Sequence, residues 1–252
     1  MVDALDSKSS SERSVRSSRT GGTIDVETEG RMTSATLVSI QRGRIVPLGP
    51  EGVPSGFVKS PVDGPIDVTA LGLVGDEQAD LTVHGGPDMA LYAYPACHYA
   101  RWSAEYPEHA DKFVFGGVGE NLTIDGWTEA DLCVGDIHAI GGVRLQVSRP
   151  RQPCFKFALR FGDNRLPKAM VRNGRVGWYY RVIETGTINA GDTVTLVNRP
   201  NPGFRFDRLV QIINFNDASD AELRTMAELP GLASKLRDLA RLATALPASP
   251  GH

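Results

Sequence analysis

The sequence predicts a mainly β fold with added helices: a barrel or sandwich of short strands, followed by a small helical unit. Three observations predict this fold. Short alternating apolar segments end at glycine turns through most of the chain, and a single segment in the middle has helical spacing. After Pro200 and Pro202 the apolar period changes from strand-like to helical. The 252 residues are enough for one sizeable core with a small appendage.

The first 31 residues are predicted to be a disordered leader. They are rich in serine, glycine and charge, and they hold too little apolar surface to offset the entropy of ordering. Periodic sequence begins near Met32, which is also an alternative start of the natural chain. We therefore expect a barrel domain over 32–203 and a three-helix domain over 204–247.

Alternating residues predict the strands. Thr36, Val38 and Ile40 alternate before a tight turn at Arg42 and Gly43. The clearest hairpin joins 138–140 to 143–147 across Gly141 and Gly142, a two-residue turn that tolerates positive φ. Further strands are predicted at 178–184 and 193–198, and many such strands with glycine turns favour a barrel or sandwich.

Helical spacing appears first between Pro95 and Pro107, where Tyr99, Trp102 and Tyr106 recur on one face. This is the single helix that the sequence predicts before residue 204.

The C-terminal region has three helical signals. Residues 206–213 present one apolar face, and Ser219 with Glu222 forms a capping box for a second helix. Pro230 is predicted to open a third helix, in which Leu232, Leu236 and Leu239 form the apolar stripe.

Composition narrows the class of protein. A net charge of -3 excludes a polycation that binds nucleic acid, although a local phosphate pocket remains compatible with it. The chain has no apolar run long enough for a bilayer and its N-terminus lacks an apolar signal region, so we expect a cytoplasmic protein without a membrane partner. The three widely spaced cysteines fit neither a disulfide framework nor a zinc site.

The strongest chemical signal is the loop 149–156. It places Arg149, Arg151 and Lys156 around Cys154 with no acid among them, and such a field stabilises a thiolate. Two prolines restrict the loop, which would hold the sulfur in a defined direction for a metal or a nucleophilic reaction. The alternative, a buried inert cysteine with nearby surface arginines, remains open on these residues alone.

Two glycine-rich segments are weaker signals. In 83–88 the backbone N–H groups could form an anion nest with His84 at its mouth, but such histidines more often satisfy a local hydrogen bond. Residues 116–121 lack the spacing of a dinucleotide fingerprint and the lysine of a P-loop. We therefore exclude both nucleotide motifs there.

Several other residues have structural interpretations. Cys97 and Cys133 are predicted to pack in the core, and His98 and His109 to lie on a helix surface. The aromatic residues at 178–180 favour a packed strand over a stacking platform, with Arg181 beside them able to reach a phosphate.

Four segments taken together carry a resemblance: Val-His-Gly-Gly-Pro-Asp at 83–88, Gly-Glu-Asn-Leu at 119–122, Arg-Pro-Arg-Gln-Pro-Cys at 149–154 and Gly-Trp-Tyr-Tyr-Arg-Val at 177–182. In order and spacing the chain resembles the MOSC domain family, named for the C-terminal domain of molybdenum cofactor sulfurases. Residues 75–80 and the helical tail are similar to its compact bacterial YiiM-like branch, which is linked to resistance against N-hydroxylated purines. The resemblance covers about Met32 to Leu242.

The resemblance implies a MOSC-type β-barrel followed by a small C-terminal three-helix domain, and a molybdenum cofactor whose pterin bears a phosphate. By the same resemblance Cys154 would be the ligand to molybdenum, which suits a soft thiolate. Lys59, Arg151 and Arg181 would neutralise the phosphate and pterin oxygens. His84 would serve as a catalytic proton donor lining the pocket, and Asn121 as a hydrogen-bond partner of pterin or substrate.

The implied reaction is reduction of an N-hydroxylated base or a related N-hydroxylated small molecule. The chain has neither a four-cysteine cluster motif nor a flavin fingerprint, so its electrons should come from a separate reductase. A non-catalytic carrier of molybdenum cofactor or sulfur is the alternative, and a thiol hydrolase using Cys154 and His84 ranks third. The oligomeric state is left open, with a homodimer as one option.

Overall fold

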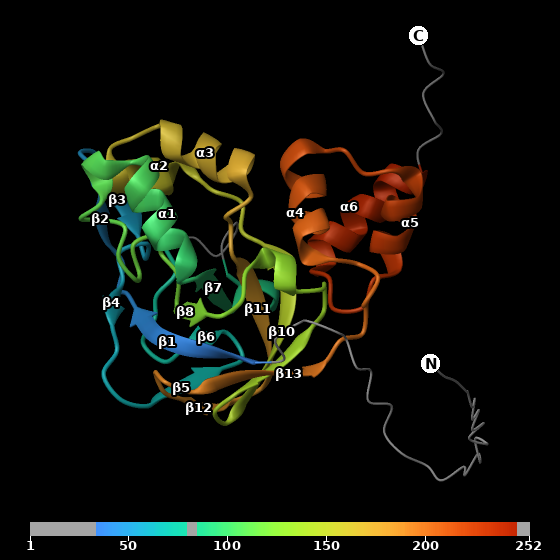
Figure 1. Ribbon diagram of the computed structural model, residues 1–252, viewed down its shortest axis with the longest axis horizontal. Helices are drawn as coiled ribbons and strands as arrows, with labels where there is room; N and C mark the ends of the chain where they lie inside the picture. Colours follow the sequence, from blue (N-terminus) through green and yellow to red (C-terminus); the bar gives the residue numbers. More distant parts are fainter. Residues whose placement is uncertain (1–33, 80–84, 246–252) are drawn as a thin grey trace, which may run out of the picture. The chain divides into compact units, whose positions relative to one another are not determined.

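A computed structural model describes residues 34–79 and 85–245 of the chain (Figure 1). The predicted leader, Met32 and His84 lie outside the described residues. The strands are β1 (Ser34–Arg42), β2 (Val46–Leu48), β3 (Val53–Ser55), β4 (Ser60–Pro61), β5 (Ile66–Thr69), β6 (Gly72–Leu73), β7 (Leu91–Pro95), β8 (Leu122–Asp125), β9 (Ile137–Ile140), β10 (Val143–Pro150), β11 (Trp178–Glu184), β12 (Gly186–Ile188) and β13 (Thr193–Asn198).

The helices are α1 (Cys97–Glu105), α2 (Phe155–Phe161), α3 (Arg165–Asn173), α4 (Phe206–Phe215), α5 (Asp220–Glu228) and α6 (Ser234–Ala245). Three short 3₁₀ helices join them: η1 (Pro87–Met89), η2 (Pro107–His109) and η3 (Glu129–Asp131).

Seven strands close into a barrel. Their order is β13-β9-β10-β11-β7-β8-β1, and β1 pairs again with β13, so the ring has no free edge between these two strands. All neighbours are antiparallel except β7 and β8, which are parallel because α1 crosses between them. The closed ring confirms the barrel and excludes the sandwich.

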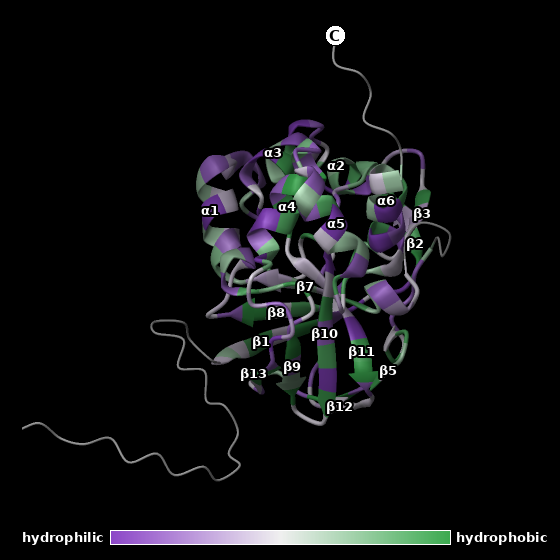
Figure 2. Cartoon of the chain, turned by 90° about the vertical axis from the view of Figure 1, so that its right-hand side faces the viewer, coloured by the Kyte–Doolittle hydropathy of each residue, from purple (hydrophilic) through white to green (hydrophobic). Residues whose placement is uncertain are grey.

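The hairpin β9–β10 is formed as predicted, with Val143 opposite Ile140 across the two glycines. Strands β11 and β13 have the predicted bounds. Along β10 hydrophilic and hydrophobic residues alternate (Figure 2), and the buried positions Val143, Leu145 and Val147 share one face.

In β1 the strand is correct but the buried face differs from the alternation of Thr36, Val38 and Ile40. Ala35 and Leu37 are buried at the start of the strand and Ile40 and Gln41 near its end, whereas Thr36 is exposed. The register with β8 shifts between Leu37 and Ser39, and such a bulge moves the following side chains to the opposite face.

Helices α2 and α3 lie between β10 and β11, where the sequence analysis predicted no helix. Each ends at a glycine with positive φ, Gly162 at 73° and Gly174 at 70°. Helix α2 has only seven residues, so its periodic signal is weak; α3 has nine residues and buries Leu166, Ala169 and Met170 at helical spacing, a pattern that the sequence analysis missed. Their buried faces, which include Phe157, Phe161 and Met170, join the core.

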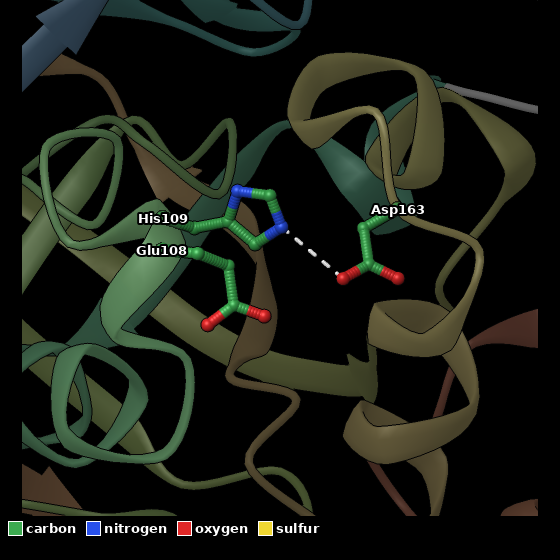
Figure 3. Close-up of side chains that lie close together, drawn as sticks. All are labelled: Glu108, His109 and Asp163. Atoms are coloured by element: carbon green, nitrogen blue, oxygen red, sulfur yellow. Dashed lines mark hydrogen bonds and ion pairs between the residues drawn. The ribbon is translucent and has the colours of Figure 1, made fainter.

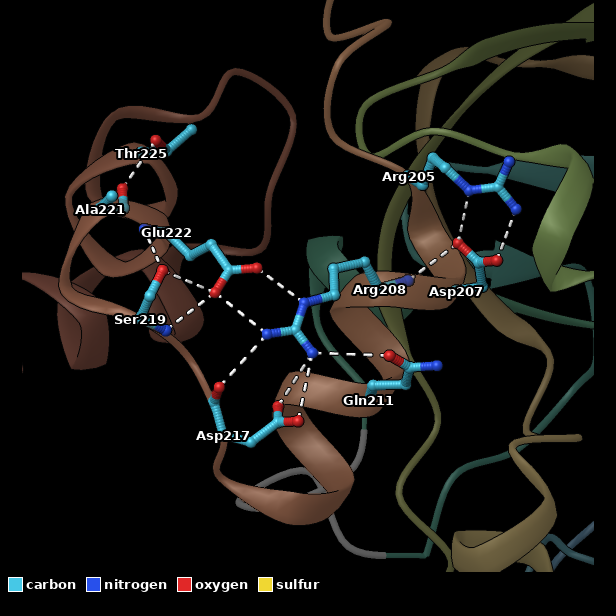
Figure 4. A network of polar contacts seen from close by, with 9 residues as sticks. All are labelled: Arg205, Asp207, Arg208, Gln211, Asp217, Ser219, Ala221, Glu222 and Thr225. Carbon is cyan, nitrogen blue, oxygen red and sulfur yellow. Dashed lines mark hydrogen bonds and ion pairs between the residues drawn. The ribbon is translucent and has the colours of Figure 1, made fainter.

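The C-terminal helices follow the prediction with two differences. Ser219 caps α5, and Glu222 completes the capping box. Figure 4 shows Arg208 of α4 between Asp217 and Glu222, which ties α4 to the start of α5. Helix α6 begins at Ser234 and not at Pro230, and Leu239 is exposed rather than part of the apolar stripe.

Backbone hydrogen bonds join these helices to the barrel. Phe206 N–H donates to the Leu132 carbonyl at 3.0 Å, and Ala233 N–H donates to the Ser148 carbonyl at 2.9 Å. Within 34–79 and 85–245, no helix has the length and apolar character needed to cross a bilayer.

Candidate functional site

A cavity opens beside the barrel where loop 149–156 leaves β10. It has about 660 Å³ of empty space, counting its open mouth. Its walls come from segments that are far apart in the sequence and that the barrel brings together. The lining residues are Ser55, Gly56, Phe57, Lys59, Asp76, Glu77, Gln78, Ala79, Gly85, Met89, Tyr92, Gly119, Asn121, Arg151, Cys154, Lys156 and Tyr179.

Cys154 lines this cavity and is partly exposed. It follows β10 after four residues and comes directly before α2, so two regular elements fix the loop that carries it. Pro153 restricts the backbone immediately before the thiol. The thiol is therefore reachable from the cavity and is not sealed in the core.

Arg151 forms one wall behind the thiol. Its guanidinium carbon lies 5.1 Å from the ring centre of Phe57 and 4.8 Å from that of Tyr92, and it donates to the Val118 carbonyl. Burial alone would lower the pKa of Arg151, but Tyr92, Tyr179 and Cys154 raise it above the ordinary value. The cavity thus has a permanent, oriented positive charge beside its cysteine.

Lys59 and Asn121 also line the cavity, and both are held by Asp76. Lys59 Nζ lies 2.5 Å from Asp76 Oδ1, and Asn121 Nδ2 donates to Asp76 Oδ2 at 2.9 Å. Burial lowers the pKa of Lys59, and the Asp76 carboxylate opposes that shift. Asn121 Oδ1 accepts from Tyr92 N–H at 3.2 Å, so its amide already links two walls.

Glu120 lies behind this wall and is fully buried. Its Oε1 accepts from Tyr99 and from Gly116 N–H, while Oε2 has no hydrogen-bond partner among the described residues. Burial raises the pKa of Glu120. Sequence reasoning missed both Asp76 and Glu120, although each belongs to a segment on which the family resemblance rests.

Tyr92 and Tyr179 form an aromatic wall that the sequence did not predict. Their ring centres are 5.2 Å apart, and burial raises the pKa of both, so both stay protonated at neutral pH. The flanking Trp178 and Tyr180 are fully buried in the barrel, as expected for a packed strand. Because side chains alternate along a strand, Tyr179 points to the face of β11 opposite to that of Trp178 and Tyr180. This alternation is the only sequence signal that distinguishes Tyr179 from them.

The three cations of loop 149–156 take different positions. Lys156 lines the cavity with Arg151, and it donates to the Pro54 carbonyl at 3.1 Å. Arg149 does not line it; one of its Nη groups donates to Gln152 at 3.3 Å, and its buried Nε has no acceptor among the described residues.

Arg181 is not brought to the cavity. It pairs with Asp88 and donates to Gln146 Oε1 at 2.6 Å. Asp88 Oδ2 also accepts from Ser234 N–H at 2.7 Å, so this group connects β11, η1 and α6. His84 lies outside the described residues, but the adjacent Gly85 lines the cavity.

The geometry brings together Lys59, Asn121, Arg151 and Cys154 of the six predicted site residues. A polarizable thiol beside a fixed guanidinium, in an open cavity, suits a soft metal that carries an anionic group. The aromatic wall offers flat surface to a ring system. The donor set therefore fits a metal held by one thiolate and attached to an organic anion.

A second cluster, Glu108, His109 and Asp163, has the residue types of a metal site (Figure 3). His109 Nε2 lies 3.1 Å from Asp163 Oδ2. However, Arg165 pairs with both carboxylates, at 2.6 Å from each, and its hydrogen bonds lower the pKa of Asp163. The guanidinium already supplies the positive charge, so this cluster is a salt-bridge network.

Two further expectations are wrong. His98 is 2% exposed and pairs with Glu129 at 2.8 Å, rather than lying on a helix surface. Cys97, expected in the core, is exposed, whereas Cys133 is buried as predicted. His98 precedes Trp102 by four residues, so it shares the buried face of α1.

Comparisons with known proteins agree with this fold. Residues 80–195 match the MOSC domain family. The protein YiiM of Escherichia coli (strain K12) is 47% identical over 150 residues, which are 60% of this chain and 67% of that protein. A Gibberella moniliformis protein named "Reductase" is 39% identical over 197 residues, which cover 77% of this chain and 35% of that longer protein. A crystal structure of YiiM from Geobacillus stearothermophilus superposes with a TM-score of 0.70 at 31% identity, covering 84% of this chain and 100% of the other.

Proposed function

The chain belongs to the MOSC domain family, and we propose on this basis that it binds a molybdenum cofactor in the barrel cavity and reduces N-hydroxylated compounds with it. The observation that supports this proposal most is the thiol of Cys154 on an open cavity beside Arg151. The relative named "Reductase" is consistent with redox chemistry at this fold.

Each residue of the cavity has a distinct part in the proposal. The Cys154 thiolate would bind molybdenum, and Arg151 with Lys156 would bind the phosphate of the pterin. Lys59 would contribute a donor while Asp76 holds it in place. Tyr92 and Tyr179 would line the ring of the pterin or of the substrate.

The proposed reaction converts an N–OH group to N–H and releases water, which consumes two electrons and two protons. Bound molybdenum would supply a two-electron redox centre. The electrons would come from a separate reductase, because the chain has no motif for a flavin or an iron–sulfur cluster. Binding of the cofactor without turnover is the alternative function.

We predict that Cys154→Ser abolishes molybdenum retention, because a neutral hydroxyl is a poor ligand for this metal. The full chain and its variants are purified from a host that makes the cofactor, and molybdenum per chain is measured after gel filtration. Cys97→Ser is the matched control, since Cys97 is exposed and does not line the cavity. Full molybdenum in the Cys154 variant would show that another residue holds the metal.

A second measurement separates enzyme from carrier. The loaded protein receives an artificial reductant and a hydroxylaminopurine, and formation of the aminopurine is followed. We expect turnover in the wild-type chain and its loss in Arg151→Met, which keeps the volume of the side chain but not its charge. A loaded protein that shows no turnover would favour the carrier function.

A further inference from the structure

A second cavity lies among α1, η3, the end of α3 and α4. It has about 1,000 Å³ of empty space, counting its mouth, and shares no lining residue with the barrel cavity. Nothing in the proposed redox function uses it. Its size is in the range that accepts a small organic ligand.

Three arginines, Arg101, Arg172 and Arg175, line this cavity. One acid, Glu105, faces all three, and they lower its pKa, with the hydrogen bond from Arg175 as the largest cause. Arg175 pairs with Glu105, and its Nη1 lies 3.1 Å from Glu105 Oε2. Its guanidinium carbon lies 5.0 Å from the centre of the Trp102 ring. Among the described residues, no ion pair involves Arg101 or Arg172.

The other charges of the cavity are already matched. Glu129 accepts from Gly177 N–H at 2.7 Å and pairs with His98, whose pKa is raised to about 9 by Cys97 and Glu129 against the effect of burial. Asp207 pairs with Arg205 at 2.6 Å (Figure 4). The cavity therefore retains the two unmatched guanidinium groups of Arg101 and Arg172.

The same cavity also has an apolar part. Phe215, at the end of α4, is 56% exposed and lines the cavity together with the buried Val210. An exposed aromatic ring that lines the same cavity as two arginines can stack on a planar ligand whose anionic group the arginines hold.

We propose that this second cavity binds a phosphorylated aromatic small molecule. The phosphate monoester carries close to two negative charges at neutral pH, which matches the two unmatched guanidinium groups. The ring stacks on Phe215. A simple carboxylate would leave one of the two cations without a counter-charge.

Titration calorimetry on the full chain tests this proposal with three probes: adenosine monophosphate, adenosine and inorganic phosphate. We expect the monophosphate to bind at least about tenfold more tightly than adenosine, since the charged group supplies most of the affinity. Inorganic phosphate should compete with it. Equal binding of monophosphate and adenosine, or no binding of the monophosphate, would overturn the proposal.

Variants locate the binding. The double variant Arg101→Ala/Arg172→Ala should weaken monophosphate binding at least about tenfold. In the part of the chain that the structure describes, neither side chain forms an ion pair that the variant would break. Arg224→Ala on α5 removes an equally exposed cation that does not line the cavity, and it should bind as the wild type does. Arg151→Met should also leave binding unchanged. Loss of binding in the Arg151 variant, with the double variant unaffected, would place the ligand in the barrel cavity and contradict the inference.

Discussion

The single carboxylate of Asp76 holds the polar side chains of the barrel cavity, Lys59 and Asn121, in place. Its two oxygens accept from Lys59, from Asn121 and from Gly43 N–H, the last at 2.8 Å. Lys59 and Asp76 side chains are 7% and 5% exposed, so the pair is withdrawn from water. A buried cation of this kind depends on its partner more than a surface lysine does.

Asp76→Asn should destabilise the fold by about 3 kcal/mol, because it leaves the Lys59 ammonium buried without a counter-charge. Urea unfolding of the wild type and the variant measures the difference in the free energy of unfolding. Asp111→Asn, at an exposed position, is the control and should have little effect. An Asp76 variant with unchanged stability would mean that Lys59 is neutral in the folded protein.

His98 makes stability depend on pH on the alkaline side. Its pKa rises from an ordinary 6.5 to about 9 on folding, so the folded state binds the proton more tightly than the unfolded chain. This contribution, about 3 kcal/mol at most, is complete below pH 6.5 and is lost as pH rises to about 9. We expect the free energy of unfolding of the wild type, but not that of His98→Gln, to fall by this amount across this pH range. Parallel plots of that free energy against pH for the two proteins would refute the assignment.

Site residues could be predicted from the sequence only where the interacting groups lie close together in the chain. The cations around Cys154 lie within five residues of it, and the sequence shows them directly. Asp76 acts through Lys59 and Asn121, and Glu120 in part through Tyr99, all of them distant in the chain. An acidic residue in a loop usually indicates exposure to solvent. His98 was placed wrongly for the same reason, since its partner Glu129 is 31 residues away.

At the scale of elements, α5 depends on its first turn. The Ser219 hydroxyl accepts from Glu222 N–H at 3.3 Å, and the Glu222 carboxylate accepts from Ser219 N–H at 2.8 Å. Together with Arg208 these contacts connect α4 to the start of α5 (Figure 4).

Ser219→Ala should lower the free energy of unfolding by about 1 kcal/mol, because the N-terminal N–H groups of α5 lose their acceptor. Thermal unfolding measures the loss. Ser219→Thr keeps a hydroxyl at the cap and should restore most of the stability. An alanine variant as stable as the threonine variant would show that Arg208 and Glu222 hold the helix start without the cap.

Elements with a strong local pattern were predicted closely, and elements fixed by tertiary contacts were not. Strands β11 and β13 have the expected bounds, because alternation and flanking turns define them. Helix α2 is too short to show a period, and the helical spacing of Leu166, Ala169 and Met170 in α3 was missed; both helices bury side chains in the common core, such as Phe157 and Met170. The bulge in β1 depends on its pairing with β8, which no local pattern encodes.

At the scale of the molecule, the Asp88 carboxylate joins the barrel to the C-terminal helices. It pairs with Arg181 of β11 and accepts from both the N–H and the hydroxyl of Ser234, the latter at 2.8 Å. Arg181, expected at the cofactor, is instead part of this junction.

Asp88→Ala should loosen α6 from the barrel while leaving the barrel closed, because the lost contacts are at the junction. Hydrogen exchange read out by mass spectrometry should show faster exchange in 234–245, with β10 still protected. Asp238→Ala, on the exposed face of α6, is the control. Equal loss of protection in α6 and the barrel would contradict a local junction.

Local sequence signals predicted either a barrel or a sandwich, and they could not decide whether the sheet closes. The ring depends on β1 pairing with β13, strands separated by some 150 residues, and alternation cannot tell which strands meet. The resemblance to a known family supplied this choice, and the observed topology confirms it.

Neighbouring residues after α3 touch both cavities. Arg175 lines the arginine-lined hollow, while the Val176 carbonyl accepts at 2.8 Å from the hydroxyl of Tyr92, which lines the other chamber. A ligand that moves this short segment in one cavity would change the position of Tyr92 in the other. Each ligand would then alter the affinity for the other by the same factor, as thermodynamic reciprocity requires.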